Sequence, residues 1–247
     1  AEAPIFRATN NNAIQPIIAL IFSAPKSRAI LREVAIPCAQ CLGFKDSPLR
    51  AIMKPNILVA GVLALDNLKT PYRSEEKIVG GAGIYSSISS SIFTNTALVA
   101  AIGNDFPENI LRLIKEHGIN TESVSKLDYP TFHWSGEYKG DMSRAITHKT
   151  EFVINEHYNW EIKEEHRETN VLLLCNNDPS IQLKILKQVK AKTIAMDTMN
   201  LWIDIATDKL DLVVSEVNIL FINDAEAQQY ANCKNLDEAA TVLLGKG

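Results

Sequence analysis

The stretch that decides the fold is Lys77-Ile-Val-Gly-Gly-Ala-Gly-Ile-Tyr-Ser86, where a short apolar run meets a glycine cluster. Gly80, Gly81 and Gly83 end the run and open onto Ile84–Phe93, which is compatible with a helix. Glycine tolerates positive φ and lets another group approach the backbone closely. The first turn of a helix also offers free N–H groups. The stretch therefore predicts a place where a small molecule lies on bare backbone, although a plain tight turn before a helix explains the glycines as well.

The segment before the glycines carries a near-continuous apolar run, Asn56–Leu65, that ends at Asp66. An apolar run without alternation is typical of a strand buried on both faces, as in a parallel sheet. In open α/β sheets, small molecules bind beyond the carboxyl ends of the strands. A carboxylate at that place can accept hydrogen bonds from hydroxyl groups, but Asp66 could equally be a turn residue.

A strand–helix rhythm follows the glycines and returns later in the chain. The run Ala97–Ile102 predicts a strand, and Asp105 and Glu108 have the spacing of a capping box for a helix that ends at Gly118. This rhythm predicts a parallel sheet covered by helices. Three later runs predict further strands: Val171–Cys175, Thr193–Met196 and Ile219–Ile222.

Polar residues follow four of the predicted strands. If these strands are parallel, their carboxyl ends meet at one rim of the sheet. Each polar residue taken alone is also explained as a turn or a helix cap. The residues are Asp66, Asn176 with Asn177, Asp197 with Asn200, and Asn223 with Glu226.

The segment Thr131–Lys139 interleaves aromatic and polar residues, and Arg144–Val153 alternates loosely after it. We expect an antiparallel hairpin that acts as a flap. The aromatic residues Phe132, Trp134 and Tyr138 are equally explained by packing between strands. The charged connection Asn155–Thr169 is expected to be partly helical and solvated.

Composition limits the class of protein. The 247 residues are 46% hydrophobic and 22% charged with a net charge of −4, which is ordinary for one large globular domain with or without an appendage. No basic block suggests nucleic acid, and no apolar run is long enough to cross a bilayer.

Cys38-Ala-Gln-Cys41 has the spacing of a redox or metal pair but lacks a second pair, so we attribute it to chance. The four cysteines are expected to be reduced, in a cytoplasmic protein.

Residues 1–52 differ from the rest, because prolines interrupt them and no helical or strand period persists. Met53 stands directly before the first clean strand. We hypothesise that the natural domain starts there and that residues 1–52 are an extension outside it.

Taken together, the motifs resemble the PfkB (ribokinase-like) family of sugar and nucleoside kinases, over about Met53 to Gly247. The order and spacing of the motifs carry the resemblance more than any one of them. They are Asp66 after the first strand, Gly80-Gly-Ala-Gly83 before a helix, Gly103-Asn-Asp105-Phe, Asp197-Thr-Met-Asn-Leu-Trp-Ile203, and Asn223-x-x-Glu226.

The resemblance implies a doubly wound, mostly parallel α/β sheet with a small antiparallel β lid built near residues 68–79 and 131–152. It implies ATP-dependent phosphorylation of a hydroxyl on a sugar or nucleoside, with Mg²⁺. By resemblance, Asp66, Gly80 and Gly81 hold substrate hydroxyls, and Asn177 is a further substrate-binding candidate. Asn223 and Glu226 would organise Mg²⁺ and its waters near the ATP phosphates, without a direct protein ligand to the metal.

One departure from the family concerns catalysis. Its Gly-Ala-Gly-Asp motif, which supplies an anion hole and the catalytic base, is absent from this sequence, so we assign no catalytic residue. We expect a fragment that lacks the catalytic C-terminal part and has negligible kinase activity by itself. The alternative is a non-catalytic binding domain for a sugar or nucleoside. A nicotinamide-dependent oxidoreductase is disfavoured, because Gly81-Ala-Gly83-Ile-Tyr-Ser86 lacks the last glycine of its fingerprint. Expected partners are the small-molecule substrate and, through the lid, a second copy of the chain.

Overall fold

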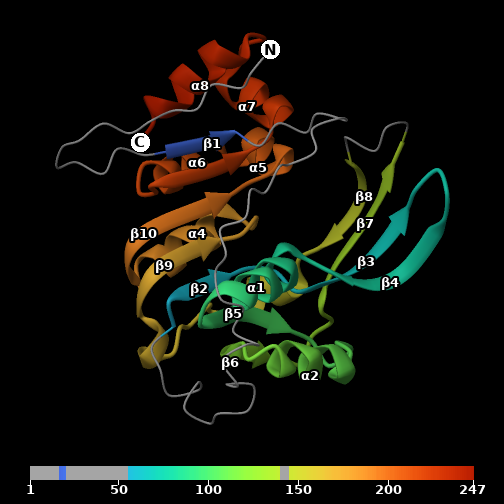
Figure 1. Cartoon of the computed structure of the whole chain (residues 1–247). Helices are drawn as coiled ribbons and strands as arrows, with labels where there is room; N and C mark the ends of the chain where they lie inside the picture. The colour runs from blue at the N-terminus through green and yellow to red at the C-terminus, as the bar shows by residue number, and fades with distance from the viewer. Residues whose placement is uncertain (1–16, 21–54, 140–144) are drawn as a thin grey trace.

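The structure is a computed structural model, and it describes residues 17–20, 55–139 and 145–247. Its main body is a seven-stranded sheet in the order β1-β11-β10-β9-β2-β5-β6, and every neighbouring pair is parallel (Figure 1). The predicted parallel α/β sheet is therefore confirmed. The strands are β1 (Ile17–Leu20), β2 (Ile57–Ala60), β5 (Thr96–Ile102), β6 (Asn120–Lys126), β9 (Glu168–Leu174), β10 (Lys190–Asp197) and β11 (Ile219–Ile222).

Helices cover both faces of this sheet and enclose two apolar cores. Side chains of β2 and β5 alternate between the cores, so that Val59 and Leu98 face one and Leu58 and Val99 face the other. The smaller core contains side chains of α1 and α2, and the larger one contains side chains of α3 to α8. The helices are α1 (Ala82–Phe93), α2 (Glu108–Glu116), α3 (Val153–His157), α4 (Pro179–Leu186), α5 (Asn200–Ile205), α6 (Thr207–Val214), α7 (Asp224–Ala231) and α8 (Leu236–Leu244).

A second sheet forms a lid that projects from one side of the main sheet (Figure 1). Its order is β4-β3-β7-β8, with β3 (Ala64–Lys69), β4 (Ser74–Gly80), β7 (Phe132–Tyr138) and β8 (Ala145–Glu151). The two hairpins are antiparallel, but β3 and β7 meet in parallel. The lid is thus a mixed sheet and not the purely antiparallel one expected, because two separate hairpins join edge to edge.

The predicted single strand Asn56–Leu65 is divided between the two sheets. β2 ends at Ala60, and β3 begins at Ala64 in the lid. The peptide between them is turned toward the glycine cluster, since Gly83 N–H donates to the Val62 carbonyl at 3.0 Å. Asp66 therefore does not follow a strand of the main sheet but lies within β3. Apolar character alone could not reveal this division, because both halves are buried.

The predicted capping box of α2 does not form. α2 has Pro107 at its N-cap and no side-chain cap. The Asp105 carboxylate instead accepts hydrogen bonds from the backbone N–H and the hydroxyl of Thr131, at 2.8 and 2.6 Å. The Thr131 hydroxyl also accepts from Gly103 N–H at 2.9 Å. This aspartate ties the loop after β5 to Thr131, the residue directly before the lid's second hairpin.

The connection Asn155–Thr169 is partly helical, as expected, but only part of it is solvated, because buried residues alternate with exposed charged ones. It contains α3 and a short 3-10 turn at Glu164–His166, and Trp160 and Ile162 are fully buried in the larger core. The many charged residues around Trp160 and Ile162 give no sign in the sequence that these two side chains are buried.

Of residues 1–52, the structure describes only β1, which pairs in parallel with β11 from Ile17↔Ile219 to Leu20↔Ile222. Cys38 and Cys41 lie outside the described residues. Within the described ranges, none of the helices combines the length and apolarity needed to span a bilayer.

Candidate functional site

A cavity of about 330 Å³ lies between the lid and the main sheet. The lid contributes Asp66, Trp134 and Tyr138 to its lining, the start of α1 contributes Gly81, and the end of β9 contributes Asn177. Small-molecule sites in proteins have volumes from roughly 300 to 1,000 Å³ and are mostly apolar with a few polar groups. The cavity has this size and composition.

Asp66 is the carboxylate of the cavity. Its register partners are Ile78 on β4 and Trp134 on β7, so it lies in the middle of the lid sheet. Its Oδ1 is enclosed and has no hydrogen-bond partner among the described residues. Burial raises the pKa of Asp66 to about 6. A half-buried carboxylate without a protein donor is suited to receive the hydroxyl group of a bound molecule.

Two of the predicted glycines serve the site in different ways. Gly81 is the N-cap of α1 with φ 91°, and a β-carbon there would come within 2.3 Å of the Val62 carbonyl oxygen. A β-carbon at Gly80 would stand 1.9 Å from Asp66 Oδ2. Gly80 thus leaves room for the carboxylate, and Gly81 makes the turn that brings bare backbone to the cavity.

The two asparagines that follow β9 have different surroundings. Asn176 uses both ends of its amide: Oδ1 accepts from the Trp202 indole N–H at 2.8 Å, and Nδ2 donates to Met199 Sδ at 3.2 Å. Asn177 Oδ1 accepts from Asp178 N–H at 2.8 Å and from Asn155 Nδ2 at 3.4 Å. Asn177 Nδ2 is enclosed without a partner among the described residues. Both asparagines line the cavity, and substrate binding by Asn177 stays a prediction.

The predicted pair Asn223 and Glu226 lies two strands away, at the carboxyl end of β11, and does not line the cavity. The two residues form a capping box: Asn223 Oδ1 accepts from Glu226 N–H at 2.9 Å, and Glu226 Oε2 accepts from Asn223 N–H at 3.2 Å. Burial raises the pKa of Glu226. Burial and the charge of Glu226 raise the pKa of Asp197, on the strand between, to about 6. Two partly buried carboxylates therefore repel each other at this rim.

Sequence reasoning assigned no role to the aromatic wall of the cavity. The rings form a chain: Phe132 packs against Phe152 with centroids 5.4 Å apart, and Phe152 packs against Trp202 at 5.7 Å. Trp134 and Tyr138 meet edge to face at 6.4 Å on the inner side of the lid. The sequence does show aromatic residues interleaved with polar ones in Thr131–Lys139, but packing between neighbouring strands explains that pattern as well as a cavity wall does.

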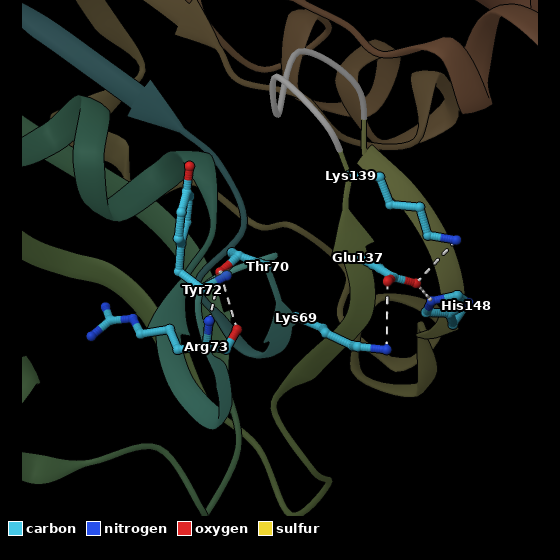
Figure 2. Close-up of polar contacts among 7 residues, drawn as sticks. All are labelled: Lys69, Thr70, Tyr72, Arg73, Glu137, Lys139 and His148. Atoms are coloured by element: carbon cyan, nitrogen blue, oxygen red, sulfur yellow. Dashed lines mark hydrogen bonds and ion pairs between the residues drawn. The ribbon is translucent and has the colours of Figure 1, made fainter.

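Charged residues tie the lid strands together away from the aromatic rings. Glu137 on β7 lies 3.5 Å from Lys69 Nζ on β3, 3.6 Å from Lys139 Nζ and 3.4 Å from His148 Nε2 on β8. Figure 2 shows these side chains converging on Glu137, with the Thr70–Arg73 turn of the first hairpin nearby. The partners of Glu137 are exposed and each pair contributes little alone, but one carboxylate links three lid strands.

No protein-family model matches the chain. A curated relative, the cytidine kinase of Thermococcus kodakarensis, is 27% identical over 202 residues, which cover 78% of this chain and 70% of that protein. Among solved structures, the nucleoside kinase of Methanocaldococcus jannaschii, an archaeal member of the ribokinase family, superposes with a TM-score of 0.57 at 19% identity. That match covers 75% of this chain and 67% of the other. This chain has a ribokinase-like fold.

A ribokinase II from E. coli, solved in complex with ATP and Mg²⁺, has a TM-score of 0.57 at 14% identity and covers 78% of this chain and 70% of that one. The resemblance to the PfkB kinases that the motifs indicated is confirmed by these matches. In this ribokinase-like chain, the cavity between lid and sheet brings together Asp66, Gly81 and Asn177. Gly80, on the neighbouring strand β4, lies against the Asp66 carboxylate. Asn223 and Glu226 lie outside the cavity, at the carboxyl end of β11.

Proposed function

We propose that the cavity binds the substrate of an ATP-dependent kinase and that the substrate is a sugar or a nucleoside. The observation that carries the proposal is the Asp66 carboxylate, half-buried in the cavity beside bare backbone at Gly80 and Gly81. A carboxylate in this setting accepts hydrogen bonds from substrate hydroxyls and fixes their position. Positioning is a large part of catalysis in phosphoryl transfer, where the protein does little covalent chemistry.

The lid has a second task in this proposal. Its inner face closes the cavity with aromatic rings, which exclude water from the hydroxyl that is to react. The lid's attachment through Asp105 and Thr131 holds these rings over the sheet. Asn177, at the opposite wall, is the second polar group that we assign to substrate binding.

The rim beside the cavity fits a divalent cation. Burial and the charge of Glu226 raise the pKa of Asp197, and a cation held through its own waters would relieve the repulsion between these two carboxylates. The described residues contain no cluster of three or more His, Cys, Asp or Glu that could ligate a metal directly. We assign Glu226 and Asn223 to this cation. When bound with ATP, Mg²⁺ neutralises charge on the phosphates.

A binding domain without catalysis is the second candidate, because the cavity alone accounts for binding and not for phosphoryl transfer. Calorimetry with ribose, fructose, cytidine and adenosine tests the binding shared by both candidates. We expect at least one probe to bind, and Asp66→Asn to weaken it by about tenfold to a hundredfold, since a hydrogen bond to a charged group is lost. Absence of binding, or an unaffected Asp66→Asn variant, would overturn the proposal.

Phosphoryl transfer separates the two candidates. The chain is incubated with ATP, Mg²⁺ and the bound probe. Phosphorylated probe would favour the kinase, and binding without transfer would favour the non-catalytic domain.

Two further expectations stay proposals. The thiols in the described residues, Cys175 and Cys233, are both free, which fits a cytoplasmic protein. Pairing of two lids in a homodimer would be tested by sedimentation.

A further inference from the structure

The inner face of the lid places an indole ring beside the Asp66 carboxylate. Asp66 on β3 and Trp134 on β7 are direct register partners on parallel strands, and both line the cavity. Neighbouring strands are about 4.8 Å apart, so the two side chains project from one face as close neighbours. A single molecule with hydroxyl groups next to a flat ring could contact both.

Gly136 and Thr147 fix the position of the indole. A β-carbon built on Gly136 would stand 2.2 Å from Trp134 Cζ2 and 2.3 Å from Cη2, so the ring lies across the backbone of Gly136. Any side chain at position 136 would push the ring away from the strand. On β8, the Thr147 hydroxyl accepts a hydrogen bond from Trp134 Nε1 at 3.1 Å. Because this N–H is occupied, the indole offers a bound molecule its ring and no hydrogen bond.

The surroundings of Trp134 support a role in binding. Tyr138 meets it edge to face at 6.4 Å and also lines the cavity. Burial, followed by the charge of Asp66, raises the pKa of Tyr138, which places its phenol within the field of the carboxylate.

The small number of polar side chains in the cavity lining favours a nucleoside over a free sugar as the ligand. A free sugar buries hydroxyls all around its ring, and each one left unpaired is costly. The amide of Asn176 is already used by Trp202 and Met199, which leaves Asp66, Asn177 and Thr150 as polar side chains of the lining outside the aromatic residues. The remaining lining is largely apolar and aromatic, which suits an aromatic ring better than further hydroxyls.

We propose that Trp134 is the stacking surface for the base of a nucleoside whose ribose hydroxyls meet Asp66. In this arrangement, Gly136 and Thr147 are positioning residues that hold the indole flat against the lid. The inference rests on the proposed function and narrows its substrate class from sugars and nucleosides to nucleosides.

The test compares cytidine and ribose, titrated by calorimetry into the 247-residue chain and its variants. The wild type is expected to bind cytidine more tightly than ribose. Trp134→Leu should weaken cytidine by between about fivefold and a hundredfold, the range of base stacking on aromatic side chains, and should change ribose by less than about twofold. Adenosine should respond as cytidine does, because every base has a flat face.

The positioning residues have their own readouts. Gly136→Ala and Thr147→Val should each weaken cytidine but not ribose, and Gly136→Ala should add little when Trp134 is already Leu. Cytidine should also quench tryptophan emission, and Trp134→Phe should remove most of the quenching, although Trp202 also lines the cavity and can retain a part of it. Ser135→Ala, one position along β7 and outside the cavity lining, is the matched control and should behave as wild type.

The outcomes separate the inference from the proposed function. Ribose that binds as tightly as cytidine, or a Trp134→Leu variant that weakens both equally, overturns the stacking surface and leaves the proposed function intact. Quenching that is as strong in Trp134→Phe as in the wild type also overturns it. A wild type that binds none of the probes overturns both.

Discussion

The Asp66 carboxylate lies directly against the backbone of Gly80, so that a β-carbon on Gly80 would stand 1.9 Å from Oδ2 and 2.7 Å from Cγ. The two residues belong to antiparallel neighbours, β3 and β4, whose register pairs Asp66 with Ile78. Glycine at position 80 therefore leaves the space in which the carboxylate sits. The sequence motif and the aspartate form one structural unit although 13 residues separate them.

Gly80→Ala is expected to displace the Asp66 side chain, so that its carboxylate can no longer accept hydrogen bonds from the substrate hydroxyls. Substrate binding should therefore weaken by about tenfold or more. The measurement is calorimetry with the probe that the wild type binds. Gly245→Ala is a matched control, because a β-carbon there would meet nothing closer than 3.4 Å. Equal affinity of Gly80→Ala and wild type would contradict the pairing of Gly80 with Asp66.

Asp66 should make substrate binding depend on pH. Burial raises its pKa to about 6, and only the ionised carboxylate accepts hydrogen bonds at both oxygens. Affinity should therefore be highest above pH 7 and fall as the pH drops through 6. Calorimetry at pH 5, 6 and 7.5 tests this. Asp66→Asn should remove most of the change, whereas an unchanged profile in this variant would assign the titration to another group such as Asp197.

The same carboxylate should lower stability at neutral pH. A carboxyl whose pKa is about 6 when folded, against 3.8 as its ordinary value, binds protons more tightly in the folded state. Its contribution is fully present below pH 3.8 and is lost as the pH rises through 6. Asp66→Asn should therefore be more stable than wild type in urea unfolding at pH 7.5, with the difference shrinking toward pH 4. A difference that grows on acidification would show that the carboxylate has a stabilising partner.

The parallel sheet was predictable because β2, β5, β9, β10 and β11 contain apolar runs, and so were the polar ends of β9, β10 and β11. The largely polar strand β6 (Asn120–Lys126) gave no such signal. The place of Asp66 was not predictable, since the run Asn56–Leu65 gives no sign that the chain leaves the main sheet after Ala60. The same holds for Asp105: its spacing to Glu108 fits a cap, and only the folded chain brings Thr131 to it. Contacts between residues far apart in sequence decide both positions.

Asp105→Ala should loosen the lid. The variant removes the acceptor of two hydrogen bonds from Thr131, and since Asp105 is exposed we expect a cost of only about 1 kcal/mol in the free energy of unfolding. Hydrogen exchange of β7 amides should increase more than that of β5 amides. Asp105→Asn, which keeps an acceptor oxygen, is the control and should lie between wild type and Asp105→Ala. Equal exchange in β7 and β5 would mean that the contact does not anchor the lid.

Asn223→Ala tests whether the Asn-x-x-Glu motif also carries structure. The variant removes the acceptor for Glu226 N–H but keeps the Asn223 backbone N–H that donates to the Glu226 carboxylate. The loss of such a cap costs about 1 kcal/mol, and Asn223→Ser should restore most of it, since serine is also a good N-cap. Urea unfolding measures both. Asn235→Ala removes the N-cap of α8 instead, where Asn235 Oδ1 accepts from the N–H groups of Asp237 and Glu238. It should cost a similar amount, because it is also the loss of a helix N-cap. If Asn223→Ala is neutral while Asn235→Ala is not, then Asn223 does not stabilise the helix, and only its proposed role beside the cation would account for the motif.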